Sequence, residues 1–95
     1  MDNVEFYLCK NWEQFQHYKR RNPPWIKLHR ALLDDYNFSS LPENSRLHLI
    51  LLWLYASQNN GKIPNNINYL ERKIDCLNLN IDILVSSGFL IPVSS

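Results

Sequence analysis

Residues 49 to 56 form an uninterrupted apolar run, Leu-Ile-Leu-Leu-Trp-Leu-Tyr-Ala, between polar stretches at 43–46 and 57–61. A short apolar run can be a strand or a helix, but the pattern extends over Leu47–Ala56, and that length favours a helix. The run is well short of the roughly 20 residues that cross a bilayer. Because a helix that is apolar on all sides is typically buried on all sides, we expect a fully buried core helix here. We expect Glu43 in its first turn and its end at Asn60-Gly61.

Two segments before this helix have patterns of their own. Residues 4–9 alternate with a period of two, which indicates a strand. The aromatic stretch 11–18 has no clean period, and we expect an irregular or single-turn segment that places Trp12 and Phe15 on the core.

A first helix is predicted to begin near Pro24. The residue before a proline avoids the helical region, whereas proline itself suits a first helical turn. Asn37 can end this helix in a left-handed conformation. The apolar residues within it follow the three-and-four spacing of one buried face. They are Trp25, Ile26, Leu28, Leu32, Leu33 and Tyr36.

Four short elements are expected after the central helix. Lys62–Pro64 can form only a short extended piece. A third helix is capped by Asn65 or Asn66, and a fourth begins at Asn78 or Asn80 and stops at Gly88. Their inward residues are predicted to be Ile67, Leu70, Ile74, Ile81, Leu84 and Val85. Phe89–Val93 is a strand candidate that can pair antiparallel with residues 4–9, with 62–64 as a third partner.

The length and the element order together define a fold class. A chain of 95 residues forms one domain, here residues 1–95, and its 45% hydrophobic content argues against disorder. Two short helices after a core helix, followed by a strand, are the plan of a winged helix-turn-helix. We therefore predict a mainly α (α+β) domain with three to four helices and a small two- or three-stranded antiparallel sheet.

Charge adds a candidate phosphate-binding surface. The formal net charge of +1 gives no global attraction for nucleic acid, but five basic residues and no acidic one lie between His17 and Arg30. These are Lys19, Arg20, Arg21, Lys27 and Arg30. Clustered cations can bind a phosphate backbone without sequence-specific contacts to bases. Tyr18 and Trp25 beside them are possible stacking groups for nucleic acid. The alternative is structural use, for example an Arg30–Asp34 ion pair on a helix surface.

The candidate recognition helix is poorly suited to sequence-specific contacts with DNA. Recognition helices use cationic or amide side chains, and Asn78–Ser87 contains no positive charge and carries Asp82. Arg72 and Lys73 on the preceding helix complete the candidate DNA contacts, although Glu71 and Asp75 lie beside them. Winged helices also bind proteins, and large aromatic residues left on the surface could serve a homodimer or another partner.

Catalysis is not expected. The chain has only two glycines, too few for a phosphate-cradling loop, and neither its histidines nor its two cysteines have metal-ligand spacing. We therefore expect no cofactor and no metal. The first residues contain no secretory signal, so we expect a cytoplasmic protein without a membrane segment.

The run from Asn11 to Leu28, NWEQFQHYKRRNPPWIKL, resembles the N-terminal region of phage and prophage replication initiators or replisome organisers. In those proteins such a run precedes a winged-helix domain. The similarity continues at residues 33–38, 61–64 and 88–90 and covers nearly the whole chain. It implies a winged-helix domain that binds DNA in replication, with the replication machinery as a candidate partner. Longer members continue beyond the winged helix, so functions of such a part are not expected within this chain.

Overall fold

Three strands form an antiparallel sheet in residues 3–12 and 23–94, the part of the chain that the computed structural model describes. They are β1 (Val4–Cys9), β2 (Lys62–Pro64) and β3 (Leu90–Ser94), in the order β2-β1-β3. The N-terminal strand is thus central, and Tyr7 pairs with Ile63 on one side and Pro92 on the other. Both predicted pairings of the first strand are confirmed.

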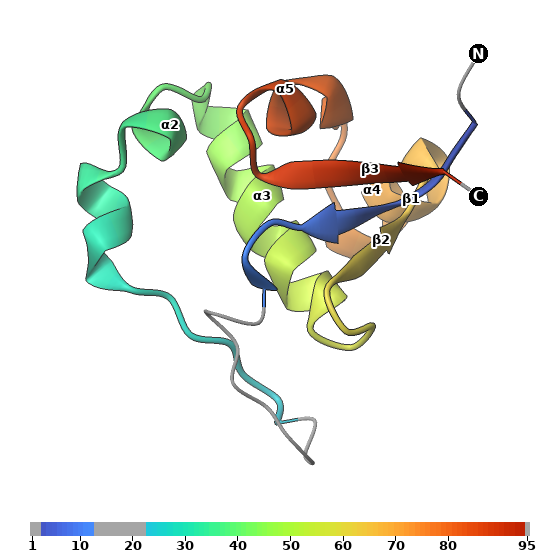
Figure 1. The fold of residues 1–95 in the computed structure, drawn as a ribbon, viewed down its shortest axis with the longest axis horizontal. Coiled ribbons are helices and arrows are strands. Elements are labelled where there is room, and N and C mark those ends of the chain that lie inside the picture. Colours follow the sequence, from blue (N-terminus) through green and yellow to red (C-terminus); the bar gives the residue numbers. More distant parts are fainter. Residues whose placement is uncertain (1–2, 13–22, 95) are drawn as a thin grey trace.

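Helices pack against one face of this sheet (Figure 1). The helices are η1 (Arg30–Asp34), α2 (Tyr36–Ser39), α3 (Glu43–Ala56), α4 (Ile67–Ile74) and α5 (Ile81–Ser86). Tyr7, Cys9, Ile63 and Leu90 point from the three strands into the buried core. The helices and the sheet therefore form two layers around one core. The predicted mainly α (α+β), winged-helix-like fold class is confirmed.

Helix α3 is the central helix, but it is not buried on all sides. Its buried residues recur at three-and-four spacing: Ser45, His48, Leu49, Leu52 and Ala56. Leu47 and Leu54 on the other side are exposed, at 51% and 42%. The prediction of complete burial is wrong because a two-layer domain covers only one side of the helix. The helix also ends at Ala56, before the expected Asn60-Gly61.

The helix pair after α3 begins where asparagine side chains cap it. Asn66 Oδ1 accepts a hydrogen bond from the Tyr69 amide at 3.1 Å, and Asn80 Oδ1 accepts one from the Ile83 amide at 3.2 Å. Each cap satisfies one of the amides that a helix start leaves without an intrahelical partner. Glu71 Oε2 accepts from the Leu79 amide at 3.1 Å and ties α4 to the connection before α5. Among the predicted inward residues of this pair, Leu70, Ile74, Ile81 and Leu84 are buried.

The predicted helix from Pro24 to Asn37 is wrong. Residues 25–29 have no regular structure, and the chain then forms η1 and α2 separately. His29 Nδ1 accepts from the Ala31 amide at 3.0 Å, and Asp35 Oδ1 accepts from the Phe38 amide at 2.8 Å. Such local side-chain bonds start a new helix at each site and so compete with one continuous helix.

The face predicted to be buried in that helix is largely exposed. Leu33 and Tyr36 are each 82% exposed, and Trp25 and Leu28 are about half exposed. Asn37 lies inside α2 and is not left-handed. Figure 1 shows the reason: residues 23–34 run along the outside of the domain, beyond α3, where no described helix or strand forms a second layer over their outer side. In the described part of the chain, no helix is long and apolar enough to span a membrane.

Candidate functional site

Four of the basic residues predicted to bind phosphate are described by the structure, and they lie on two separate segments. Lys27 and Arg30 are exposed on the segment before and in η1, whereas Arg72 and Lys73 are exposed on the last turn of α4. In Figure 1 the η1 segment lies to the left of α3, and α4 lies behind the sheet on the right. Lys19, Arg20 and Arg21, together with Phe15 and Tyr18, lie outside the described residues. Among the described members of the predicted set, Lys27 and Arg30 share one segment, whereas Arg72 and Lys73 share another.

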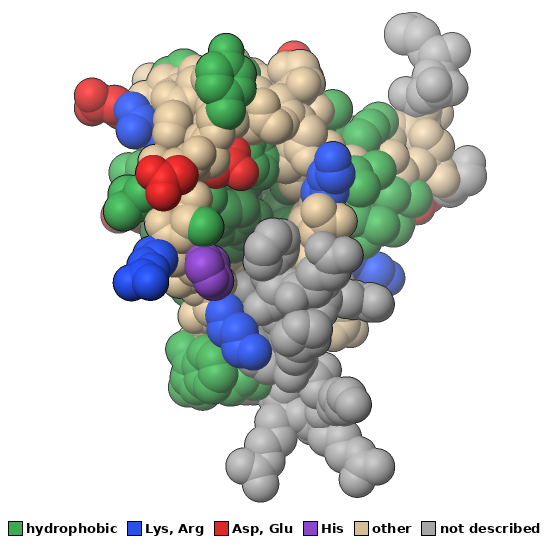
Figure 2. Space-filling view, turned by 60° about the vertical axis from the view of Figure 1, so that its left-hand side comes forward, with side chains coloured by type: hydrophobic (Ala, Val, Ile, Leu, Met, Phe, Trp, Pro, Cys, Tyr) green, Lys and Arg blue, Asp and Glu red, His purple; other side chains and the backbone are tan. Residues whose placement is uncertain are grey.

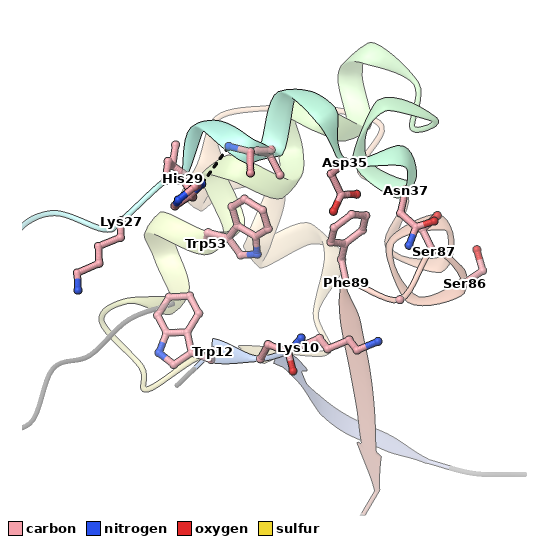
Figure 3. Close-up of a pocket in the computed structure, with 15 residues that line it drawn as sticks. Lys10, Trp12, Lys27, His29, Asp35, Asn37, Trp53, Ser86, Ser87 and Phe89 are labelled. Atoms are coloured by element: carbon pink, nitrogen blue, oxygen red, sulfur yellow. Dashed lines mark hydrogen bonds between the residues drawn. The ribbon is translucent and has the colours of Figure 1, made fainter. Parts of the chain in front are cut away.

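A groove of about 630 Å³ opens between this segment and the ends of β1, α3 and α5 (Figure 3). We call it the tryptophan groove. It is lined by Lys10, Asn11, Trp12, Lys27, Leu28, His29, Ala31, Leu32, Asp35, Asn37, Trp53, Ser86, Ser87, Gly88 and Phe89. Figure 2 turns toward this side of the molecule and shows Lys and Arg side chains among apolar ones. Its volume is within the range of about 300–1,000 Å³ of ligand-binding clefts.

The turn after β1 places Trp12 in the groove. The Cys9 amide donates to the Gly61 carbonyl at 2.9 Å, and the Lys10 amide donates to the Phe89 carbonyl at 3.0 Å. Asn11 then adopts a left-handed conformation with φ 58°. The Trp12 ring lies against Gly61 so closely that a Cβ there would be 2.7 Å from Trp12 Cγ. The Trp12 ring therefore packs in this position only because residue 61 has no side chain.

A chain of aromatic contacts places Trp53. Its ring meets Phe89 edge to face at a centroid distance of 6.4 Å, and Phe89 meets Phe38 in the same way at 6.4 Å. Such edge-to-face pairs stabilise a defined ring orientation beyond simple burial. Figure 3 shows Trp12 and Trp53 lining the same groove, Trp12 from the turn after β1 and Trp53 from α3. Both rings are half-buried.

Charged groups lie along the edge of the groove. Lys10, Lys27 and His29 are exposed there. Of the lining residues that the structure describes, Asp35 alone is acidic, and its Oδ1 already accepts the hydrogen bond that caps α2. Because His29 Nδ1 accepts from the Ala31 amide, a neutral His29 carries its proton on Nε2 as a donor. The edge therefore carries two ammonium groups and one imidazole donor and suits an anionic ligand.

Metal ligands and the buried thiol of Cys9 are two other possible sources of site chemistry among the described residues. No group of three or more His, Cys, Asp or Glu within them could hold a metal ion. Burial raises the pKa of the Cys9 thiol to about 12, so at neutral pH it is not a thiolate nucleophile.

The sequence pattern predicted part of this site and missed part. It placed Lys27 among the phosphate-binding residues. It placed Trp12 on the core, which is confirmed because Trp12 packs partly buried against the core, but it did not predict that Trp12 also lines a groove. It gave Lys10 no role and treated Trp53 only as part of the central helix. The adjacent pair of Lys10 with Trp12 was an available signal, because cations interleaved with aromatics are typical of nucleic-acid surfaces. No family model, curated protein or solved structure matches the chain.

Proposed function

We propose that this winged-helix-like domain binds nucleic acid, with DNA in phage or prophage replication as its expected partner. The observation that carries the proposal is the tryptophan groove, which Lys10 and Lys27 line from different elements together with Trp12 and Trp53. Ammonium groups attract the phosphate backbone, and this attraction supplies most of sequence-independent affinity. The resemblance of residues 11–28 to phage replication initiators supports DNA as the partner.

The contact surface proposed here differs from that of a helix-turn-helix protein. Helix α5 would be the recognition helix, yet it contains no lysine or arginine, and its exposed Asp82 would repel phosphate. Arg72 and Lys73 follow Glu71 and precede Asp75, so acidic neighbours offset their charge. We therefore assign phosphate contact to Lys10 and Lys27, with Arg30 shortly after Lys27 in sequence, rather than to α4 and α5.

Fluorescence anisotropy of labelled DNA at several salt concentrations tests this assignment. The double variant Lys10→Ala with Lys27→Ala removes two cations from the groove, and Arg72→Ala with Lys73→Ala is the matched control on α4. We expect the groove variant to bind more weakly and to reduce the salt slope by about 1 for each lost phosphate contact. The α4 variant should bind nearly as well as the original chain. A larger loss in the α4 variant would place the contact on the helix-turn-helix instead, and no binding at low salt would reject the proposal.

A second candidate function, docking of a protein partner or a second copy, has its own support. Leu33 and Tyr36 are large apolar residues and are almost fully exposed, with Trp25 and Leu28 also exposed on the same segment. Clustered exposed apolar residues mark interaction surfaces on soluble domains. Sedimentation velocity tests self-association: a dimer that Leu33→Ser with Tyr36→Ser converts to a monomer supports it. A monomer at all concentrations argues against a homodimer.

A further inference from the structure

We infer that the tryptophan groove takes an unpaired nucleobase stacked on Trp12 and Trp53, an inference that rests on the proposed function and gives it a preference for single strands. The ligand is a segment of single-stranded nucleic acid with a phosphate at the groove edge and its base against the rings. Stacking on aromatic side chains is the general means by which proteins hold unpaired bases.

The depth of the groups in the groove points to an unpaired base. Lys10 and Lys27 are exposed at the edge, whereas Trp12 and Trp53 are half-buried within it. Bases in a duplex are already stacked and present only their edges in the grooves. The phosphates of a duplex can therefore contact the cationic edge. Only an unpaired base can turn away from its neighbours in the strand and reach the rings.

Both rings are held in place before a ligand arrives. Gly61 supports Trp12, with its ideal Cβ position only 2.7 Å from Cγ, and Phe89 supports Trp53 through an edge-to-face contact at 6.4 Å. A ring that is already fixed loses little conformational entropy when a base stacks on it, and this preorganisation favours affinity. Stacking tolerates every base, which agrees with the lack of a cationic recognition helix.

The distribution of charge places a cation at each end of the groove. Asp35 lies near Phe89, away from Lys27 across the groove in Figure 3. The Lys10 ammonium also lies at the Phe89 end, 3.9 Å from the ideal Cβ position of Gly88, so phosphates of one strand can meet Lys27 at one end and Lys10 at the other. Ser86, Ser87 and Asn37 line the Phe89 end and offer neutral hydrogen-bonding groups. A base edge or a sugar hydroxyl suits such groups better than a phosphate does.

The test compares three labelled ligands of equal length on the unmodified chain: a thymidine strand of about 12 nucleotides, an abasic strand with the same phosphates, and a duplex. We expect the thymidine strand to bind about tenfold more tightly than either other ligand, and to quench tryptophan fluorescence when the abasic strand does not. Equal affinity for the thymidine and abasic strands overturns the inference. If the duplex and the abasic strand bind but thymidine has no advantage, only the stacking inference fails. If no ligand binds at low salt, the proposed function fails as well.

Substitutions then locate the stacking. Trp12→Leu and Trp53→Leu should each lose about tenfold in affinity for the thymidine strand and leave the abasic strand unaffected. Trp25→Leu is the control, because Trp25 does not line the groove, and it should change neither affinity. Circular dichroism shows whether each variant is folded. If both groove variants bind the thymidine strand as tightly as the unmodified chain does, the inference is overturned. It is also overturned if thymidine monophosphate binds as tightly as the thymidine strand, because that result would indicate a pocket for a single nucleotide.

Discussion

The segment 23–39 and the region 43–94 use the same kinds of apolar side chain in opposite ways. In the region 43–94, Leu49, Leu52 and Leu70 are completely buried between the helices and the sheet. In the segment 23–39, Leu33 and Tyr36 are almost fully exposed. Apolar content alone therefore does not decide burial; what decides it is whether a second layer lies against that side of the chain.

The tryptophan groove lies where these two regions meet. Trp53 and Phe89 come from the packed region, whereas Lys27 and His29 come from the segment. The turn after β1 adds Lys10 and Trp12 to these groups. Binding residues on loops that a rigid scaffold holds in place are frequent in proteins. Most of the stability should therefore come from the packed region, whereas the segment supplies a large part of the site.

Truncation of one leucine in each region should give the largest contrast. Leu52 is 0% exposed, so Leu52→Ala should lower the free energy of unfolding by about 2–5 kcal/mol, through lost burial and the cavity left behind. Leu33→Ala should change it by no more than about 0.5 kcal/mol, because Leu33 contributes little buried surface. Urea denaturation followed by circular dichroism measures both. A comparable loss in the two variants would show that the segment 23–39 is part of the cooperative core.

The two glycines, Gly61 and Gly88, differ in the space available for a side chain. Gly61 and Gly88 both have positive φ, 81° and 85°, so alanine is strained at either position. At Gly61 the new Cβ would also collide with Trp12, whereas the nearest atom at Gly88 is Lys10 Nζ at 3.9 Å. Gly88→Ala should therefore cost only the backbone strain of about 1–2 kcal/mol. Gly61→Ala should cost more and should also displace Trp12.

The readouts for this pair are thermal unfolding and tryptophan emission. A shifted emission maximum in Gly61→Ala alone would report the movement of Trp12. Equal stability of the two variants, with unchanged emission in both, would contradict the close packing of Trp12 on Gly61.

The region 43–94 could be predicted from sequence because its signals are local and agree with one another. Asn66 and Asn80 cap the two short helices, and Gly88 with its positive φ follows the second. The expected strands at 62–64 and near the C-terminal end also formed. Hydrophobic period, caps and turn residues all indicated the same elements, and such consistency is what makes a pattern reliable.

The segment 23–39 and the groove could not be predicted, for two physical reasons. The three-and-four spacing from Trp25 to Tyr36 predicts a buried face only if a partner surface exists, and that depends on the tertiary arrangement. His29 and Asp35 also bond to nearby amides and divide the helix. Lys10 and Trp53 line the same groove because the backbone bonds of the turn after β1 and the contact of Trp12 with Gly61 hold that turn near the end of α3. These contacts join residues far apart in the sequence, so no local sequence pattern predicts them.

The smallest of the expected effects concerns a polar group inside the packed region. His48 on α3 is 3% exposed, and its Nδ1 has no hydrogen-bond partner among the described residues. Burial lowers the pKa of His48, although the nearby Glu71 carboxylate acts in the opposite direction. In the unfolded chain a histidine has its ordinary pKa of about 6.5. Above that pH both states are neutral, and the folded state has its full stability.

As the pH falls below this value, the unfolded chain binds a proton that the folded chain does not, so the free energy of unfolding decreases. We expect urea denaturation between pH 7 and pH 5 to show this decrease, and His48→Gln to reduce it, because glutamine does not titrate. An unchanged slope in His48→Gln would show that another group causes the pH dependence.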